Sequence, residues 1–550
     1  MEVVPSIESY AGPKKDKYVW LKWTMAALIA VLNGYAAVMM YASGEWVFAL
    51  LDLVVVSVGL YVFMNKKTYA HRYIFPGVAG MVVFIIFPLA YTIGIAFTNY
   101  SGSNLLSLEQ ARDYHLKKTY KVTGGEFDFT LLGGENNQFQ LLLKQDDQSF
   151  ISQPLTLLNN KARTLAVREG RVRDEPQVVQ LQPLAGEATD KAAPIRAIVD
   201  HRTHLSALDV VLPEGNIHLT LSSLRKFAAQ KQLYTQLVDG AVLKSGVMIK
   251  DSNLLRDNQS GELMLPNPDT GFYQYIDADG HFVGKGMAPG FVVSVGWKNF
   301  VRIMTDPGIQ GPFMQIFVWT VIFSACSVAF TLAIGMVMAC LVQWEQLRGR
   351  GFYRVMLILP YAIPAFISIL VFKGLFNQNF GEINLFLEAA FGIKPDWYTN
   401  PFLAKVMILI VNTWLGYPYM MILCMGLLKA IPEDLYEASA MDGAGPVQNF
   451  FKITVPLLMK PLTPLLIASF AFNFNNFVLI QLLTNGAPDI IGASTPAGTT
   501  DLLVNYTYRI AFQGSGGQDY GLASAIATAI FLIVGALALL NLKLSKADKL

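Results

Sequence analysis

The chain has 550 residues, of which 53% are hydrophobic and 15% are charged. Soluble domains usually carry about 25% charged residues, so a purely soluble enzyme is not expected. The net charge of +2 is too small to suggest nucleic acid as a partner. The charges are also unevenly spread, because residues 101–300 hold 21 basic and 22 acidic side chains. The composition therefore predicts a water-soluble block within an otherwise lipid-soluble chain.

Eight apolar stretches are long enough to cross a bilayer, which takes roughly 20 residues in a helix. They cover residues 19–41, 46–64, 74–97, 313–342, 355–376, 404–428, 462–484 and 520–542. The first is too long for the core of a signal peptide and has no small-residue cleavage site after it, which predicts a retained anchor. The second contains Asp52, which we expect to pack against a polar neighbour or to reach outward.

Basic residues fall in alternate loops between these spans. They are Lys14, Lys15 and Lys17, then Lys66, Lys67 and Arg72, then Arg348, Arg350 and Arg354, then Lys429, Lys452 and Lys460, and finally Lys543, Lys546 and Lys549. Short basic loops stay in the cytoplasm, so both termini are expected inside and residues 98–312 outside. The predicted organisation is a tail with three spans (1–97), an external domain (98–312) and a five-span core (313–550).

The external domain is expected to be β-rich. Phe127–Leu132, Phe139–Leu143 and Leu208–Leu212 are short, mainly apolar runs near turn residues, as strands tend to be, whereas Leu224–Leu237 has helical spacing. All three cysteines, Cys326, Cys340 and Cys424, lie in apolar stretches. The domain therefore has no disulfide framework and no Cys-based zinc site available.

Motifs for catalysis are absent from the sequence. There is no phosphate-binding P-loop, no nucleophile elbow and no His-Glu-x-x-His pair. The six histidines are scattered without partner motifs, and we interpret them as surface residues. No catalytic residue and no metal site are predicted. The later spans are nearly free of ionisable groups, which disfavours a proton-coupled sugar carrier.

The loop of residues 433–456 carries a distinctive pattern. It contains Tyr436-Glu437-Ala438-Ser439-Ala440-Met441-Asp442-Gly443 and then Ile453-Thr454-Val455-Pro456. Glu437, Ala440 and Ala444 fit one face of a short helix, Gly443 permits a break, and Pro456 is expected to end the helix before the seventh span. We predict a rigid cytoplasmic knob that docks another protein; the alternative is an ordinary amphipathic connector.

This loop resembles the EAA loop of ABC-importer membrane subunits, with Ser439 and Val455 as small departures. The resemblance implies that Glu437, Ala438, Ser439, Gly443, Ile453 and Pro456 couple the chain to an ATPase. Residues 470–477 and 499–506, together with eight spans and an external insertion after the third, are similar to the permease subunits of maltose/maltodextrin importers.

That family resemblance implies an all-α polytopic membrane protein with a type I ABC-importer core and an immunoglobulin-like periplasmic insertion. It implies a bacterial inner-membrane location with residues 98–312 in the periplasm. The implied partners are a second permease subunit (MalG-like), two copies of an ATPase subunit (MalK-like), a periplasmic maltose-binding protein, maltose or maltodextrin, and membrane lipid. No cofactor is expected in this chain, since the partner ATPase would bind ATP and Mg.

Two spans carry matching neutral polar stripes. Asn412, Leu415, Gly416 and Tyr419 stand at i, i+3, i+4 and i+7 of the sixth span, and Ser469, Phe472, Asn473 and Asn476 repeat this spacing in the seventh. Asn amides suit sugar hydroxyls, and aromatic rings suit the apolar faces of pyranoses. The alternative is helix packing through buried Asn and Ser.

The family resemblance implies that these eight residues and Tyr361 bind maltose. Ala365 stands where the family pattern has Ser, so the side chain at this position has no hydroxyl to offer a sugar. The predicted function is a non-enzymatic permease subunit that translocates maltodextrins by alternating access. The alternatives are a permease for another neutral oligosaccharide and a membrane receptor with a periplasmic sensor domain.

Overall fold

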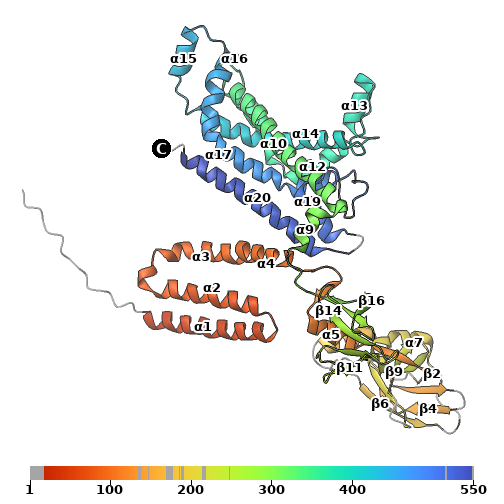
Figure 1. Ribbon diagram of the computed structural model, residues 1–550. Helices are drawn as coiled ribbons and strands as arrows, with labels where there is room; N and C mark the ends of the chain where they lie inside the picture. Colours follow the sequence, from red (N-terminus) through yellow and green to blue (C-terminus); the bar gives the residue numbers. More distant parts are fainter. Residues whose placement is uncertain are drawn as a thin grey trace, which may run out of the picture. The chain divides into compact units, whose positions relative to one another are not determined.

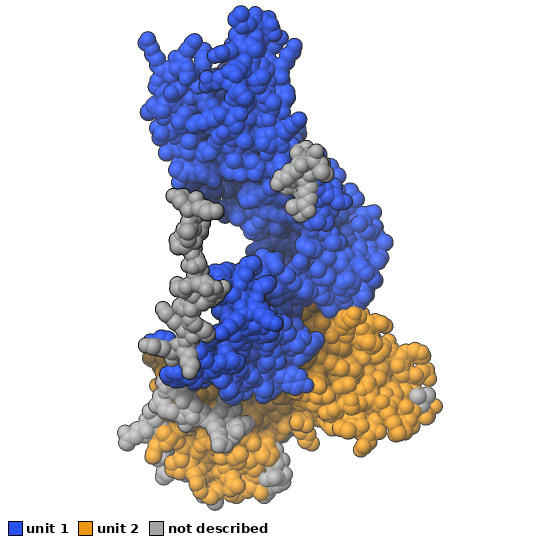
Figure 2. Space-filling model, turned by 90° about the vertical axis from the view of Figure 1, so that its left-hand side faces the viewer, with its two compact units in different colours: residues 1–98, 295–550 blue, residues 99–294 orange. Residues whose placement is uncertain are grey.

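The computed structural model describes residues 18–133, 138–145, 148–168, 177–184, 186, 191–213, 218–243, 245–246, 248–514 and 517–547. The chain divides into two compact units, Met1–Thr98 with Val295–Leu550, and Asn99–Ser294 (Figure 2). The second unit therefore ends before residue 312, where the sequence interpretation placed the domain boundary. The predicted cytoplasmic residues Lys14, Lys15, Lys17 and Lys549 lie outside the described residues.

Within the described residues, seven helical segments are long and apolar enough to cross a membrane. They are α1 (Val19–Ala42), α2 (Trp46–Met64), α3 to α4 (His71–Ala96), α10 (Pro307–Gln343), α14 (Pro401–Leu428), α16 to α17 (Pro446–Phe474) and Tyr520–Leu540 within α20 (Tyr520–Ala547). The pair α11 (Arg350–Ala362) and α12 (Ala365–Leu375) makes an eighth if it crosses as one span. The predicted helical membrane fold is confirmed.

The fifth span is not the single straight helix that residues 355–376 predicted. Helices α11 and α12 meet at an angle of 91°. Pro364 causes the break, because proline disfavours helical geometry in the residue before it, and Ile363 accordingly has φ −88° and ψ 132°.

The core of the first unit is built around α10. This helix packs on α14, α17 and the short helix α19 (Leu503–Phe512), and α20 packs on α4, α17 and α19. Figure 1 shows α10, α14, α17 and α20 gathered in one bundle. The remaining helices of the unit are short: η1 (Lys66–Thr68), α9 (Lys298–Thr305), α13 (Glu382–Phe391), α15 (Asp434–Met441) and α18 (Phe477–Leu483).

The second unit is β-rich, as predicted, and its main sheet has eight strands in the order β2-β9-β8-β7-β6-β4-β3-β5. They are β2 (Thr119–Gly133), β3 (Gln138–Gln145), β4 (Gln148–Ser152), β5 (Leu155–Thr156), β6 (Gln177–Pro183), β7 (Leu208–Val211), β8 (His218–Ser223) and β9 (Lys226–Gln232). Because β2 also pairs with β3, the sheet closes on itself, and β6 and β7 run parallel. This differs from the antiparallel two-sheet sandwich of an immunoglobulin-like fold.

A second sheet has five strands in the order β10-β13-β14-β15-β16. They are β10 (Tyr234–Gln236), β13 (Leu255–Asp257), β14 (Leu263–Asn267), β15 (Phe272–Ile276) and β16 (Phe282–Met287). Two small pairs, β1 (Asn104–Leu106) with β17 (Gly290–Phe291) and β11 (Ala241–Val242) with β12 (Met248–Ile249), and the helices α5 (Leu108–Leu116), α6 (Asn160–Arg168), α7 (Ile195–Asp200) and α8 (Arg202–Leu205) complete the unit.

The three predicted strands are confirmed, because they fall in β2, β3 and β7. The helix predicted over Leu224–Leu237 is wrong, since this segment forms β9 and β10. Its apolar side chains match a helical period by spacing, but β9 bonds to β2 and β8 on its two sides. Pairing with β8, which directly precedes it, and with β2, which is distant in sequence, thus overrides the local pattern.

The histidine interpretation is partly wrong. His115, His201 and His204 are buried within the second unit, whereas His71, His218 and His281 are exposed. His204 is held by its surroundings as a neutral ring, because its Nδ1 accepts a hydrogen bond from the Leu158 N–H at 2.8 Å. The other ring nitrogen then donates to Gln177 Oε1 at 3.2 Å.

Candidate substrate site and coupling loop

The seventh span breaks at its polar run. Helix α17 (Val455–Phe474) ends at Phe474, and α18 begins at Phe477. Between them Asn475 has φ −108° and ψ 22°, and Asn476 has φ −76° and ψ 72°. Asn is a poor helix former because its side chain competes for backbone hydrogen bonds. Asn473 and Asn476, two of the residues predicted to bind sugar, thus lie at a helix end, where Asn473 is buried in the core.

Three asparagines of the two predicted stripes meet at this break. Asn412 on α14 donates to Asn473 Oδ1 at 2.8 Å and accepts a hydrogen bond from Asn476 Nδ2 at 3.2 Å. Asn473 Nδ2 donates in turn to the Ser469 carbonyl one helical turn earlier, at 2.9 Å. Asn412 and Asn473 are each 7% exposed. The amides satisfy one another here, so a sugar hydroxyl would have to replace one of these bonds.

The predicted aromatic residues face outward instead. Tyr361, Tyr419 and Phe472 are 58%, 41% and 74% exposed. The hydrogen bonds between described residues do not join any of these three to the asparagine group. An exposed aromatic ring leaves a face free for stacking on a sugar. The role of the nine residues in binding stays a prediction.

Gly416 has a packing role that the sequence interpretation did not include. A Cβ atom built on Gly416 would lie 2.8 Å from Thr331 Cγ2 on α10. Neighbouring helices that approach this closely require a small residue at the contact. Leu415, on the same stripe, packs partly against the apolar cluster formed by α10, α12, α14 and α18. The spacing that suggested a sugar-binding face therefore also serves helix packing.

The predicted cytoplasmic knob is a helix followed by a glycine turn. Helix α15 carries Glu437, Ala438 and Ser439, and Gly443 follows it with φ +79°. The Gly443 N–H donates to the Ala440 carbonyl at 3.0 Å, and the Ala444 N–H donates to the Ser439 carbonyl at 2.9 Å. These bonds satisfy the last carbonyls of the helix, as left-handed glycine caps do.

A tyrosine side chain connects this knob to the helical segment that leads into the next span. The Tyr436 hydroxyl lies 2.9 Å from Thr454 Oγ1, within hydrogen-bond distance. The outer face is open, since Glu437 and Ala438 are exposed and Met441 is 89% exposed. A fixed helix with an uncovered face can receive a partner protein.

Pro456 does not end a helix, contrary to the prediction. Helix α16 (Pro446–Asn449) continues through the π-helical segment Phe450–Thr454 into α17. Proline lacks an N–H and its ring presses on the carbonyl four residues earlier. A π-helical turn directly before it rearranges the hydrogen bonds at that position. Ile453 lies within this π-helical turn.

A buried ion pair between the last two spans escaped the sequence analysis. Asp501 is fully buried, and its Oδ2 accepts hydrogen bonds from Arg509 Nη1 at 3.1 Å and from the Gly498 N–H at 2.6 Å. Arg509 also reaches Asp489 at 2.7 Å. Burial raises the pKa of the Asp501 carboxyl to about 6, although the Arg509 charge opposes this shift. The sequence does hold a signal for this ion pair, because an Asp and an Arg stand eight residues apart next to spans that carry almost no charge.

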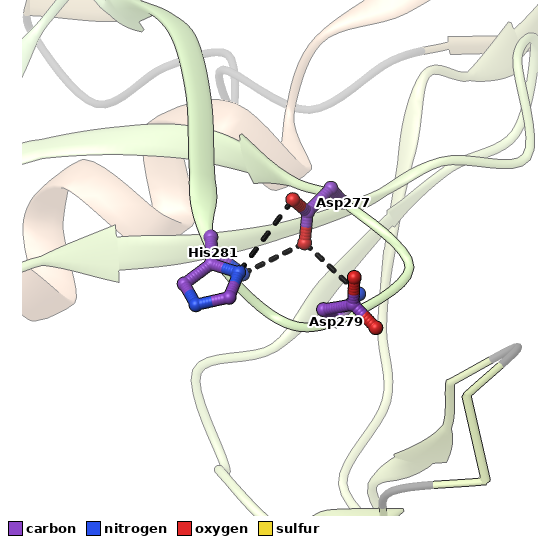
Figure 3. A group of neighbouring side chains, drawn as sticks. All are labelled: Asp277, Asp279 and His281. Atoms are coloured by element: carbon purple, nitrogen blue, oxygen red, sulfur yellow. Dashed lines mark hydrogen bonds and ion pairs between the residues drawn. The ribbon is translucent and has the colours of Figure 1, made fainter.

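Asp277, Asp279 and His281 form a group of possible metal ligands in the second unit (Figure 3). Their backbone forms the turn between β15 and β16, where Asp277 Oδ1 accepts hydrogen bonds from the Asp279 and His281 N–H groups at 2.9 and 2.8 Å. His281 Nδ1 lies 3.7 Å from Asp277 Oδ2. The turn itself therefore accounts for the cluster.

Asp52 keeps an unusual environment within the second span. It is half-buried on α2, and its Oδ2 is buried without a hydrogen-bond partner in the part of the chain that the structure describes. A polar neighbour, which the sequence interpretation offered as one possibility, does not bond to this oxygen there.

Three family models match this chain. Residues 106–296 match the maltose transport system permease protein MalF P2 domain, and residues 20–67 match the MalF N-terminal transmembrane helices. Residues 331–544 match the binding-protein-dependent transport system inner membrane component. The resemblance found in the sequence is therefore confirmed for the β-rich insertion, for the first spans and for the core.

Curated relatives match over almost the whole length. The maltose/maltodextrin transport system permease protein MalF of Yersinia pestis is 57% identical over 541 residues, 97% of either chain. The proteins of the same name from Vibrio cholerae and Escherichia coli K12 are 55% and 54% identical, each over 97% of this chain and over 96% and 98% of their own. The chain belongs to the family of MalF permease proteins, the multi-pass inner-membrane components of ABC importers.

Proposed function

We propose that this chain is one of the two membrane-spanning subunits of an ATP-driven importer for maltose and maltodextrins. Family membership supports the importer class, and the observation that carries the proposal is the meeting of Asn412, Asn473 and Asn476 inside the core. These groups are neutral and can both donate and accept, as binding of a hydroxyl-rich solute requires. Ions or phosphate esters would need charged partners in the same place.

The energy source lies in the partners. Two copies of an ATPase subunit would bind ATP and Mg and would grip the exposed face of α15 around Glu437. A second permease subunit would complete the translocation path. Closure of the ATPases would push the knob, reorient α11 to α18 and expose the asparagine group to the periplasm. A periplasmic maltose-binding protein, docked in part on residues 98–312, would then release its sugar there.

The proposed orientation follows from the basic loops. The termini and the knob would be cytoplasmic, and residues 98–312 periplasmic, in the inner membrane of a bacterium. This places the docking sites for the ATPase and for the binding protein on opposite sides of the membrane, as alternating access requires.

Co-purification tests the importer proposal. The chain is tagged at its C-terminus, extracted in mild detergent, and its partners are identified by mass spectrometry. We expect one P-loop ATPase in two copies and a second permease. Recovery of the chain with a signalling kinase instead would favour the receptor alternative.

Sugar uptake then tests the substrate. Proteoliposomes that hold the purified complex, with maltose-binding protein outside and ATP inside, should accumulate labelled maltose. Unlabelled maltotriose should compete, whereas a neutral oligosaccharide without α-1,4-linked glucose should not. The reverse pattern would support a permease for another neutral oligosaccharide.

A further inference from the structure

Helix α19 reaches the break in the seventh span through one buried side chain. Asn505 is 1% exposed, and its Nδ2 donates to the Phe477 carbonyl at 3.0 Å. Phe477 directly follows Asn476, the last residue of the predicted site. The ring of Tyr508, also on α19, lies 5.0 Å from the Phe477 ring. Two residues of α19 thus contact the residue that restarts the helix after the break.

Helix α19 is itself held at its start. The Leu503 N–H donates to Thr320 Oγ1 on α10 at 3.1 Å, and Trp319 Nε1 on the same helix donates to the Thr500 carbonyl at 3.3 Å. The ion pair between Asp501 and Arg509 joins a residue two positions before α19 to the last turn of that helix. The helix therefore forms a fixed support between α10 and α18.

The break needs such a support. A helix holds its own residues in place by bonds to the fourth preceding residue, and these bonds are interrupted where α17 ends. The Asn476 N–H donates to Asn473, only three residues back, and the Phe477 N–H donates to Asn475. The direction in which the Asn476 amide points thus depends on where α18 restarts, and Asn505 bonds to the first residue of α18.

We propose that Asn505 is a positioning residue that sets the geometry of the Asn473–Asn476 break and, through it, the affinity of the substrate site. The inference rests on the proposed function, because it takes the asparagine group as the place where sugar binds. Asn505 itself need not touch the sugar. No other described side chain donates a hydrogen bond to the Phe477 carbonyl.

The test is equilibrium binding of labelled maltose to the assembled complex, arrested with a non-hydrolysable ATP analogue. Asn505→Leu removes the donor at similar size, and the Kd for maltose should rise about tenfold, the scale of one lost hydrogen bond to a binding group. Assembly and nucleotide binding should stay at the parental level. Thr507→Val is the matched control, because within the described residues the Thr507 hydroxyl donates only inside α19, to the Leu503 carbonyl at 2.7 Å. The Kd of this variant should stay within twofold of the parental value.

A double-mutant cycle separates positioning from general loosening of the core. Asn476→Ala alone should weaken maltose binding. In that background Asn505→Leu should change the Kd by less than twofold, because the amide that Asn505 orients is gone. Equal factors in both backgrounds would overturn the inference. If Asn505→Leu does not assemble, Asn505→Asp, which keeps the shape and lacks the amide donor, takes its place.

The outcomes also distinguish the inference from the function beneath it. If Asn476→Ala weakens binding but Asn505→Leu does not, Asn505 is not a positioning residue and the substrate site stands. If Asn476→Ala leaves maltose binding unchanged, the proposed substrate site itself is wrong, and the inference falls with it.

Discussion

The glycine at position 416 can be explained in two ways, by sugar binding and by helix packing. On the predicted sugar-binding stripe, a residue without a side chain would leave space for a sugar, and the structure shows that Gly416 also lets α14 approach Thr331 on α10. Both uses require the absence of a side chain. A substitution that restores only the packing can separate them.

We expect Gly416→Ala to destabilise the core by about 1–3 kcal/mol, because the added methyl group would overlap Thr331 Cγ2. Thr331→Ser removes that methyl carbon and keeps the hydroxyl, which donates to the Ser327 carbonyl at 2.7 Å. The thermal midpoint of the purified complex should fall for Gly416→Ala and recover in the double variant. If transport stays low after stability has recovered, Gly416 also leaves room for the sugar; a midpoint unaffected by Gly416→Ala would contradict the packing role.

The buried histidines predict how the stability of the unit Asn99–Ser294 responds to acid. Burial, with smaller contributions from Arg163 and His201, lowers the pKa of His204 to about 4. Burial and Lys118 lower the pKa of His115 to about 4 as well. The unfolded chain then binds protons below pH 6.5 that the folded unit does not, so stability falls as the pH drops from 6.5 to 4. For each of the two histidines, the free energy of unfolding should fall by about 3 kcal/mol over this pH range.

Hydrogen exchange of residues 99–294 in the full chain, corrected for the intrinsic rate at each pH, measures this loss. Protection of β6 and β7 should be lower at pH 4.5 than at pH 7. His204→Gln should weaken the pH dependence, and His281→Gln, at an exposed position, should leave it unchanged. Equal protection at both pH values would show that these rings do not control the stability.

At the scale of elements, the knob depends on the turn that ends α15. Gly443 has φ +79°, a left-handed conformation that costs other residues roughly 1–2 kcal/mol. Gly445, two residues later, has φ −83°, and a Cβ there would meet nothing within 4 Å. The two glycines therefore allow a controlled comparison, because Gly443 requires a left-handed backbone and Gly445 does not.

We expect Gly443→Ala to lower maltose-stimulated ATP hydrolysis by the assembled complex about tenfold, the equivalent of 1.4 kcal/mol. Gly445→Ala should hydrolyse ATP at close to the parental rate. The measurement is phosphate release from proteoliposomes with maltose-binding protein. Equal rates for the two variants would indicate that the ATPases do not depend on the shape of this turn.

The π-helical segment before Pro456 determines how the knob is connected to α17. It lets the chain pass from the knob into α17 as a continuous helical segment, Pro446–Phe474. A stop at Pro456 would have left a joint between the knob and the asparagine group. A continuous rod can instead transmit a push at α15 to the break at Asn475, where the helix ends.

At the scale of the whole molecule, the orientation of the two units across the membrane can be tested directly. Ser252 is exposed in the unit Asn99–Ser294, and Val447 is 72% exposed beside the knob. We expect a membrane-impermeant thiol reagent to label Ser252→Cys in spheroplasts and to label Val447→Cys only after the membrane is opened. The parental chain, with its three cysteines, is the control. Labelling of Val447→Cys in closed spheroplasts would reverse the proposed topology.

The sequence alone determined which stretches are apolar enough to span a membrane, the β-rich insertion and the helical knob with its glycine turn. These features depend on the hydrophobicity of each residue and on local backbone preferences, which a chain carries wherever it folds. Eight apolar stretches remain apolar in any packing arrangement, and a Gly after a short amphipathic helix ends it without help from distant residues.

Tertiary structure decided which polar groups meet. Asn412 lies 61 residues from Asn473 and 64 from Asn476, and only the packing of α14 on α17 and α18 makes them one group. The same is true of β9, which became a strand through its partners, and of His204, which is neutral because its neighbours bury it. A hydrogen bond or a buried charge depends on both partners, and the distance between them is set by the fold.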